Sequence, residues 1–368
     1  MLISVLLALK SLPDLVPFTV LLSTAPTFFA LWMPFRVVSV VLPRKAYGTA
    51  DDFTWGLYQR FVLFFFEKLC PVEVIFYGDI DKVLAKKESV LYMSNHQSTV
   101  DWIVADMLAV RQGSLGQMRY VLKDGLRFLP LYGYYFYQHD CLYVRRSRKF
   151  NADRLQKSLQ SIPKYRNRTW LIIFPEGTRF NPNNPAVAAS SQAFDRKSGL
   201  SALQNVLSPR TKAFHLAQRN LKSYFDAVYD VTVMYSQTVL ENAQGGISRG
   251  LAPSMNDYMH GAGEQVHIVV KRFGLEELPE EEEETHKWLH GRYVEKDRIM
   301  GDFFRDRSVP SGGRKVPLPW LSVLPAAVLF TGLNIALWST ETGRKIYFTS
   351  AIGGTAFALT YMGLRKVA

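Results

Sequence analysis

Three long stretches without a charged residue constrain this chain more than any other feature. They comprise residues 15–35, 316–340 and 346–364, which are 21, 25 and 19 residues long. The hydrocarbon core of a bilayer is about 30 Å thick and needs roughly 20 helical residues to cross it, so each stretch is long enough to span. Backbone groups inside lipid must bond to one another, which favours a helix for each. We therefore predict an integral membrane protein.

The two C-terminal stretches are separated by residues 341–345 alone, so we predict a helical hairpin that crosses the membrane twice. Basic residues flank the outer ends of the pair, at Arg314, Lys315, Arg365 and Lys366. This distribution indicates that both ends face the cytosol. A helical hairpin buried in a soluble core is the alternative.

The N-terminal stretch differs both from a regular span and from a signal peptide. Pro17, Pro26 and Pro34 interrupt helical hydrogen bonding, so we expect a kinked or partly inserted segment. Asp14 stands where a signal peptide carries positive charge, so we expect this segment to be retained. The apolar run at residues 61–66 is too short to span and is either an interfacial anchor, half of a membrane-embedded hairpin, or core.

Between the apolar ends, β-rich runs alternate with helical patterns. The runs are residues 72–77, 90–93, 120–122, 142–144, 170–174, 231–235 and 266–270, and the helical patterns are residues 99–110, 152–159 and 286–304. Such alternation predicts an α/β domain whose sheet is flanked by helices, and continuously apolar runs indicate strands covered on both faces. We expect residues 181–191 to be a turn-rich connection.

This pattern divides the chain into three parts. We predict an N-terminal membrane anchor at residues 1–69, an α/β domain at 70–308, and a linker with the transmembrane hairpin at 309–368.

Charge and missing motifs exclude several classes of function. The 44 basic and 32 acidic residues give a net charge of +12, which favours an anionic membrane surface, phosphorylated small molecules or nucleic acid as partners. The apolar stretches favour the first two, so we expect no nucleic-acid partner. The two cysteines rule out a metal site built mainly from thiolates, and we predict no metal site. Motifs of P-loop nucleotide hydrolases, Rossmann enzymes, zincins and serine hydrolases are absent from the sequence.

His96 and Asp101 form the first pair of residues with catalytic chemistry, directly after the β-rich run at residues 90–93. An imidazole can take a proton from an alcohol, and a carboxylate on its other nitrogen fixes the tautomer. Their spacing of five is not that of neighbours on a helix face. The pair therefore requires His96 just before a helix and Asp101 in its first turn. Alternatively, residues 98–101 form a helix cap and Asp101 is purely structural.

The second passage is F-P-E-G-T-R at residues 174–179, which again ends a predicted strand. Ligands of open α/β sheets bind beyond the carboxyl ends of the strands. Gly177 permits close backbone approach, and the planar guanidinium of Arg179 matches phosphate oxygens. A glycine turn with a solvated arginine is the alternative. Lys123 and Arg146 follow other strands and could complete a phosphate pocket, although such residues are more often surface charges.

Together the two passages resemble the glycerolipid acyltransferase (PlsC-like) family, which carries N-H-x-x-x-x-D and F-P-E-G-T-R at about this separation. The likeness runs along nearly the whole chain. It implies that His96 is the general base and Asp101 its partner. It also implies a substrate-binding site for the acceptor phosphate at Lys123, Arg146, Glu176, Gly177, Thr178 and Arg179. The family's fourth block contains a proline, whereas residues 228–235 here do not, so the acyl-chain contacts stay unassigned.

The resemblance further implies the reaction. A fatty acyl group passes from acyl-CoA to the sn-2 hydroxyl of 1-acyl-glycerol-3-phosphate (lysophosphatidic acid), giving phosphatidic acid. Acyl-CoA is a co-substrate, and no cofactor is expected. Other lysophospholipid acceptors, hydrolysis as a thioesterase or phospholipase, and noncatalytic lipid binding are the alternatives. We expect the endoplasmic reticulum membrane, with a mitochondrial membrane as the alternative, and a cytosolic catalytic domain.

Overall fold

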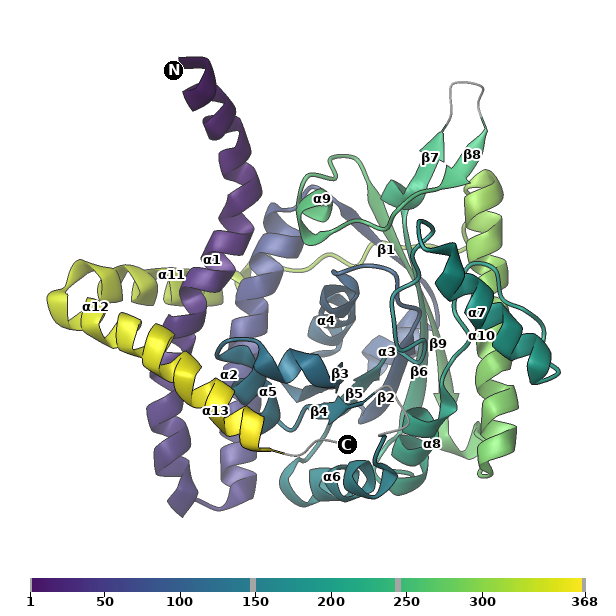
Figure 1. The fold of residues 1–368 in the computed structure, drawn as a ribbon, viewed down its shortest axis with the longest axis horizontal. Helices are drawn as coiled ribbons and strands as arrows, with labels where there is room; N and C mark the ends of the chain where they lie inside the picture. Colours follow the sequence, from purple (N-terminus) through teal and green to yellow (C-terminus); the bar gives the residue numbers. More distant parts are fainter. Residues whose placement is uncertain (1, 146–149, 242–245, 366–368) are drawn as a thin grey trace.

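A seven-stranded sheet with helices on both faces organises the molecule (Figure 1). The computed structural model describes residues 2–145, 150–241 and 246–365. The strands are β1 (Glu73–Gly78), β2 (Val90–Ser94), β3 (Met118–Lys123), β4 (Leu142–Val144), β5 (Trp170–Ile173), β6 (Ala227–Tyr235) and β9 (Gln265–Gly274), in the order β1-β9-β6-β2-β5-β3-β4. The five strands from β6 to β4 run parallel, and β9 pairs antiparallel with β6 and parallel with β1. The predicted α/β architecture is confirmed.

The central strands are covered on both faces. Along β2, Val90 and Tyr92 belong to one core cluster, whereas Leu91 and Met93 belong to the other. This two-sided burial is why the strand reads as a continuous apolar run. The first face is covered by α1 (Leu2–Val38), α2 (Arg44–Leu63), α4 (Asp101–Gln112) and α5 (Tyr132–Gln138), and the second by α6 (Ala152–Tyr165), α8 (Thr211–Asn220) and α10 (Glu282–Asp306).

Shorter elements complete the architecture at its periphery. They are α3 (Ile80–Ala85), α7 (Pro185–Lys197), α9 (Met255–Met259) and the hairpin of β7 (Val239–Glu241) and β8 (Ile247–Arg249). Helix α6 shows why these sequences fold as they do. The Asn151 side chain caps its start by accepting from Arg154 N at 2.9 Å. Leu155, Leu159 and Ile162 then form a buried stripe with helical spacing.

Helix α7 corrects an expectation, because residues 181–191 were predicted to be a turn-rich connection. A turn is present before the helix, but α7 begins at Pro185 and continues to Lys197. Proline is favourable in the first turn of a helix, where its missing N–H has no partner to lose. The alanines that follow favour the helix further.

The N-terminal helix α1 is continuous through its prolines, without the interruption that the sequence predicted. Within the described part of the chain, Leu21–Val41 is the one helical stretch long and apolar enough to cross a membrane, which weakly indicates membrane association. The apolar run at residues 61–66 belongs to the core, since Phe61 and Phe66 are almost fully buried. The run is therefore a core segment, rather than an interfacial anchor or half of a membrane-embedded hairpin.

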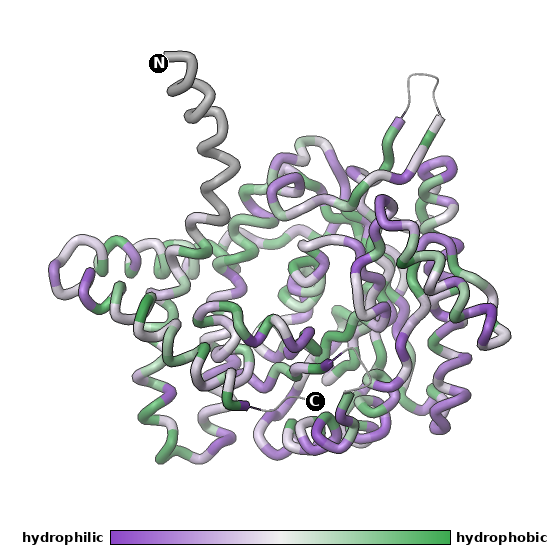
Figure 2. The backbone as a smooth tube through the Cα atoms, viewed as in Figure 1, coloured by the Kyte–Doolittle hydropathy of each residue, from purple (hydrophilic) through white to green (hydrophobic). Residues whose placement is uncertain are grey.

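The C-terminal stretches form a helical arm that projects from the rest of the molecule (Figure 1). It consists of α11 (Leu324–Ser339), α12 (Glu341–Phe348), a π-helical turn and α13 (Thr355–Leu364). The chain reverses at Thr340, whose hydroxyl accepts from Gly343 N at 2.9 Å, so residues 341–345 begin a helix rather than form a separate turn. Helix α11 has 16 residues and spans about 24 Å, less than the 25-residue stretch predicted. Hydrophilic residues on the arm gather at its tip (Figure 2).

Both ends of the chain pack together beside the sheet. Thr27 of α1 donates to the Asn334 side chain of α11 at 2.6 Å, and the Tyr347 hydroxyl donates to Ser23 O at 2.9 Å. The predicted membrane anchor and the predicted hairpin are therefore neighbours in one helical layer.

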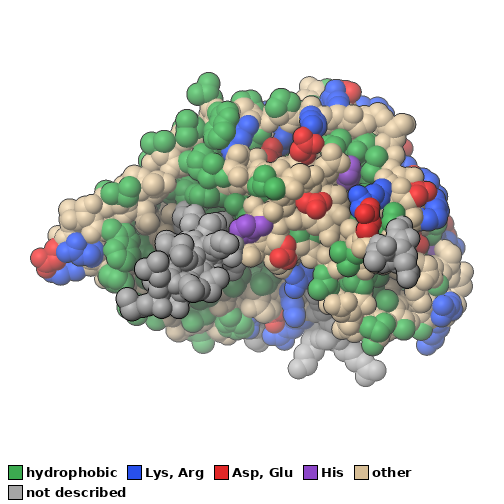
Figure 3. All heavy atoms as spheres, turned by 90° about the horizontal axis from the view of Figure 1, so that it is seen from above, with side chains coloured by type: hydrophobic (Ala, Val, Ile, Leu, Met, Phe, Trp, Pro, Cys, Tyr) green, Lys and Arg blue, Asp and Glu red, His purple; other side chains and the backbone are tan. Residues whose placement is uncertain are grey.

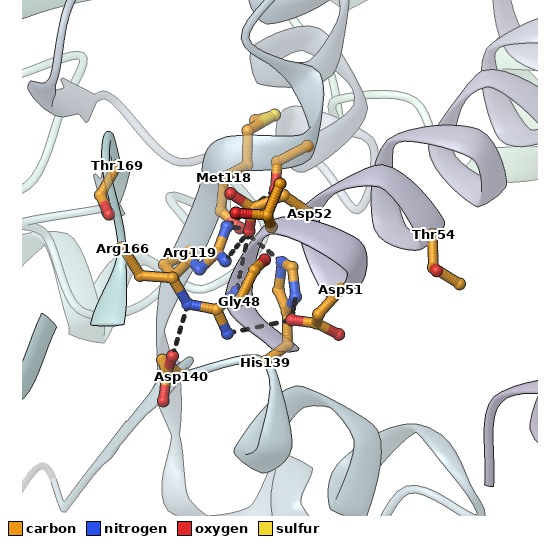
Figure 4. Close-up of polar contacts among 12 residues, drawn as sticks. Gly48, Asp51, Asp52, Thr54, Met118, Arg119, His139, Asp140, Arg166 and Thr169 are labelled. Carbon is orange, nitrogen blue, oxygen red and sulfur yellow. Dashed lines mark hydrogen bonds and ion pairs between the residues drawn. The ribbon is translucent and has the colours of Figure 1, made fainter. Parts of the chain in front are cut away.

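A buried cluster of charged side chains attaches α2 to the amino edge of the parallel strands (Figure 4). Its members are Asp51 and Asp52 of α2, Arg119 of β3, His139 and Asp140 after α5, and Arg166 after α6. Arg166 donates to Asp51 at 3.0 Å, to Asp52 at 2.9 Å and to Asp140 at 2.7 Å. Multiple partners of this kind offset the desolvation cost of a buried charge.

Candidate active site

The two sequence motifs meet at the carboxyl edge of the sheet. Strands β2 and β5 are adjacent and parallel, so the segments that follow them lie side by side. The His96 ring stacks on the Phe174 ring with centroids 4.5 Å apart, and Phe180 N donates to His96 O at 2.8 Å. Ligands bind at this edge in open α/β sheets.

His96 and Asp101 form a hydrogen-bonded pair. Nδ1 of His96 lies 2.7 Å from Oδ2 of Asp101, which is the first residue of α4. The required arrangement, with His96 just before a helix and Asp101 in its first turn, is present. The Asp101 side chain is 1% exposed, whereas the His96 side chain is 21% exposed. Because the buried carboxylate accepts from Nδ1, Nε2 of the neutral ring is available to take a proton.

Asp101 also has the structural role that the sequence offered as an alternative. Its Oδ2 accepts from Gln97 N at 2.7 Å and from Ser98 N at 2.9 Å, which holds the turn before α4. Its Oδ1 accepts from the Tyr235 hydroxyl at 2.6 Å. One carboxylate therefore both shapes the loop and orients the imidazole.

Glu176 fastens the two motifs together. Its Oε1 accepts from His96 N at 2.8 Å, and its Oε2 accepts from Leu207 N at 3.1 Å. The residue is 2% exposed, and this burial raises the pKa of its carboxyl group to about 8 although the two backbone bonds oppose the shift. Glu176 therefore braces the loop that carries the candidate base.

The rest of the second motif turns outward at this edge. Gly177 has φ +70°, a left-handed conformation that favours glycine, and its N donates to Phe174 O at 3.0 Å. Thr178 and Arg179 are exposed, and among the described residues no ion-pair partner faces Arg179. Arg179 is therefore an exposed cation one position before Phe180, whose backbone N bonds to His96 O.

The other predicted phosphate ligands follow neighbouring strands. Lys123 is the exposed last residue of β3, which is parallel to β5 and ends at the same edge. Arg146 lies outside the described residues, and Arg145 pairs with Asp124 at 3.0 Å. Substrate contacts of Lys123, Arg146 and the second motif stay predictions.

Arg210 is a cation at this edge that the sequence analysis missed. Its N donates to Pro175 O at 2.8 Å, and a Cβ on Gly177 would lie 3.0 Å from its Nε. The side chain therefore lies against the glycine turn. Arg210 is exposed and has no ion-pair partner within the described part of the chain. No spacing in the sequence signals the contact between Arg210 and Gly177, because it forms only when the loop that contains Leu207 folds against the turn.

Models of known protein families match two parts of the chain. The model of the acyltransferase family matches residues 77–236, and that of the acyltransferase C-terminus matches residues 257–330. The 1-acyl-sn-glycerol-3-phosphate acyltransferase epsilon of Mus musculus is 42% identical, over 96% of this chain and 97% of that protein.

The chain belongs to the acyltransferase family.

A second member, the probable 1-acyl-sn-glycerol-3-phosphate acyltransferase 5 of Arabidopsis thaliana, is 30% identical over 98% of this chain and 92% of that protein. The crystal structure of the 1-acyl-sn-glycerophosphate (LPA) acyltransferase PlsC from Thermotoga maritima has a TM-score of 0.42 and 15% identity, covering 79% of this chain and 98% of that chain.

In this acyltransferase, Arg249 at the end of β8 anchors the β7–β8 hairpin to the loop of the first motif. Its guanidinium donates to the Gln97 side chain at 2.9 Å and to Asn205 O at 2.7 Å. The guanidinium carbon lies 3.9 Å from the centroid of the Phe180 ring. The loop around His96 is therefore held from β5, β6 and β8.

Two observations concern possible binding sites elsewhere in the molecule. Among the residues that the structure describes, no group of three or more His, Cys, Asp or Glu side chains could hold a metal ion. A cavity of about 390 Å³ lies at the opposite edge of the sheet, between α2, the turn before β3 and residues 167–168. The cavity is thus separate from the two motifs.

Proposed function

We propose that this protein transfers a fatty acyl group from acyl-CoA to the sn-2 hydroxyl of 1-acyl-glycerol-3-phosphate, giving phosphatidic acid. The observation that carries the proposal is the His96–Asp101 pair, braced by Glu176 against the second motif. Similarity to curated 1-acyl-sn-glycerol-3-phosphate acyltransferases over almost the full length supports this choice of acceptor.

In the proposed reaction His96 is the general base. Its Nε2 takes the proton of the acceptor hydroxyl as that oxygen attacks the thioester carbonyl carbon. The tetrahedral intermediate then collapses with loss of the carbon–sulfur bond, and His96 returns the proton to the departing CoA thiolate. Asp101 stabilises the imidazolium that forms between these steps. General base catalysis of this kind contributes roughly 10²–10⁴-fold to the rate.

Exposed cations supply the proposed phosphate site. Lys123, Arg179 and Arg210 all lie near the carboxyl edge, and the last two flank the turn at Gly177. A guanidinium can bind phosphate oxygens through two parallel hydrogen bonds. The acceptor phosphate and the phosphates of CoA are the anions that these groups would bind.

Membrane attachment completes the proposal. The arm of α11 to α13 presents hydrophobic side chains to solvent (Figure 3). They include Val328, Ile335, Ile352 and Phe357. Contiguous exposed apolar surface of this kind marks an interaction site, and lipid is the partner that the reaction requires. The choice of the endoplasmic reticulum, with a cytosolic catalytic domain, rests on the family resemblance alone.

Apolar surface also lies along the carboxyl edge of the sheet, where the candidate active site is found. The loop after β3 exposes Leu126, Phe128 and Leu129. Arg127 of the same loop donates to Arg365 O, just beyond α13, at 2.8 Å. A lipid acceptor could therefore stay partly in the bilayer while its glycerol group reaches His96.

Product analysis tests the proposal. Purified full-length protein in phosphatidylcholine vesicles is given radiolabelled acyl-CoA with and without lysophosphatidic acid. We expect labelled phosphatidic acid that depends on the acceptor, with the label at sn-2 after phospholipase A2 digestion. Acceptor-independent free fatty acid would show a thioesterase instead. Absence of both products would favour a noncatalytic lipid-binding protein, and a panel of lysophospholipids ranks the acceptors.

A further inference from the structure

Tyr235 completes the surroundings of Asp101 from a neighbouring strand. It is the last residue of β6, which pairs in parallel with β2. Its hydroxyl donates to Asp101 Oδ1 at 2.6 Å, while Oδ2 faces His96 Nδ1 at 2.7 Å. Tyr235 is fully buried and Asp101 is 1% exposed. Both oxygens of the carboxylate are thus held, each by a different part of the fold.

The packing of the Tyr235 ring and the bond of its hydroxyl can be separated experimentally. Its ring meets the edge of Tyr258 at 90°, with centroids 6.4 Å apart. Tyr258 is also buried in the same core cluster, but its hydroxyl has no hydrogen-bond partner among the described residues. Tyr258 therefore provides a matched control, with the same side chain and environment but no bond to Asp101.

We propose that Tyr235 is a positioning residue for acyl transfer, which orients the Asp101 carboxylate toward His96 and draws negative charge from it; this rests on the proposed function. Burial, followed by the negative charge of Asp101, raises the pKa of Tyr235 well above its usual value of 10. Its hydroxyl therefore stays a donor over the whole range in which an acyl-transfer assay is run.

Loss of this hydroxyl should change the protonation of His96 in a definite direction. Without the bond, Oδ1 is a buried acceptor with no partner among the described residues, and the carboxylate carries more negative charge toward the imidazole. This favours the protonated ring, so the free base forms only at higher pH. The acidic limb of the pH–rate profile should move upward, because that limb reports the deprotonation of the base.

The other titratable groups around the pair should contribute equally to the wild type and the variant. Glu176, with a pKa of about 8, bonds to His96 N from the segment that follows β5. Arg249 approaches through Gln97, and burial lowers its pKa to about 10, so it stays cationic. Tyr92 is on β2, and its burial, together with the negative charge of Asp101, raises its pKa far above the assay range. None of these groups bonds to the Tyr235 hydroxyl within the described chain.

The test compares Tyr235→Phe with Tyr258→Phe in the full-length protein on phosphatidylcholine vesicles. We expect Tyr235→Phe to lower kcat by about ten-fold, as for loss of a hydrogen bond to a charged group. KM for lysophosphatidic acid and for acyl-CoA should stay within about two-fold, since Tyr235 reaches neither substrate. The midpoint of the acidic limb should rise by about half a pH unit or more. Tyr258→Phe should keep the wild-type kcat and midpoint.

A second readout does not require acyl transfer. Diethyl pyrocarbonate modifies the neutral imidazole. The rate of modification at His96, measured by mass spectrometry as a function of pH, therefore reports the same deprotonation midpoint. If wild-type protein forms no phosphatidic acid, the proposed function fails, and an upward shift in this readout would still support the Asp101 contact. Wild-type midpoints in Tyr235→Phe would overturn the inference. A uniform loss of rate with an unchanged midpoint would also overturn it, because it would show a merely structural role.

Discussion

The carboxyl group of Glu176 accepts a hydrogen bond from the backbone nitrogen of His96 at 2.8 Å, across 80 positions of sequence. The same side chain accepts from Leu207 N at 3.1 Å. Any movement of the second motif is therefore passed to the loop that carries the candidate base. This contact joins the two motifs in the fold.

Glu176 should make stability depend on pH. Because its pKa is raised from 4.5 to about 8, the folded protein holds a proton that the unfolded chain releases. Its contribution to stability is therefore fully present below about pH 4.5 and is lost as the pH rises through 8, by up to about 1.4 kcal/mol per unit. Glu176→Gln should flatten the decline of the thermal unfolding midpoint between pH 5 and 8. The exposed Glu283→Gln is the control, and parallel curves for all three proteins would contradict the prediction.

Asp101→Asn should reduce kcat by about 10³–10⁴-fold, because the amide favours the wrong tautomer of His96. KM values should change little, since Asp101 is buried behind the imidazole. Steady-state kinetics with lysophosphatidic acid check this prediction. A loss of less than ten-fold, with the folded protein retained, would limit Asp101 to its role in the loop.

Arg179→Ala and Arg210→Ala should each raise KM for lysophosphatidic acid by about ten-fold, as expected for loss of a charged hydrogen bond. Their kcat should fall less, because neither guanidinium is needed for proton transfer. The exposed Arg196→Ala on α7 controls for loss of surface charge. If both variants bind the acceptor as the wild type does, the assigned phosphate site is wrong.

Val328→Lys combined with Ile335→Lys should weaken binding to vesicles. Both residues are exposed on one face of α11, and charged side chains are costly to place in lipid. Flotation with phosphatidylcholine vesicles measures the bound fraction. Val294→Lys, at an exposed apolar position on α10, should bind as the wild type does. Equal flotation of all proteins would exclude the arm as the membrane contact.

Arg166→Met should destabilise the fold by about 3–5 kcal/mol, because it leaves buried carboxylates without their cation (Figure 4). Arg168→Met is the control, since Arg168 has no ion-pair partner among the described residues. Thermal unfolding of the two variants separates these outcomes. An unchanged midpoint for Arg166→Met would show that the cluster contributes little.

Much of the fold and the pairing of His96 with Asp101 could be predicted because they depend on local pattern. Burial on both faces makes the sequences of β2 and β5 continuously apolar, so both strands can be recognised. His96 and the second motif follow directly after the ends of these strands. Tyr235 could not be predicted, because its bond to Asp101 joins residues 134 positions apart through the pairing of β6 with β2.

Other contacts escaped prediction for the same physical reason. Arg210 reaches Gly177 through a loop, and Asp51 meets Arg166 only when α2 packs on the amino edge. Helix α7 was missed because Pro185 was read as a turn former rather than as a first-turn residue. For Arg210 and Asp51 the partner in the fold, rather than the residue type, carried the information.

The central claim is that the His96 imidazole activates the acceptor hydroxyl. Its most direct test is formation of phosphatidic acid by His96→Ala, with the exposed His260→Ala as control. We predict a loss of roughly 10²–10⁴-fold for His96→Ala with the thermal unfolding midpoint retained, and wild-type turnover for the control. Wild-type formation of phosphatidic acid by folded His96→Ala would contradict the account.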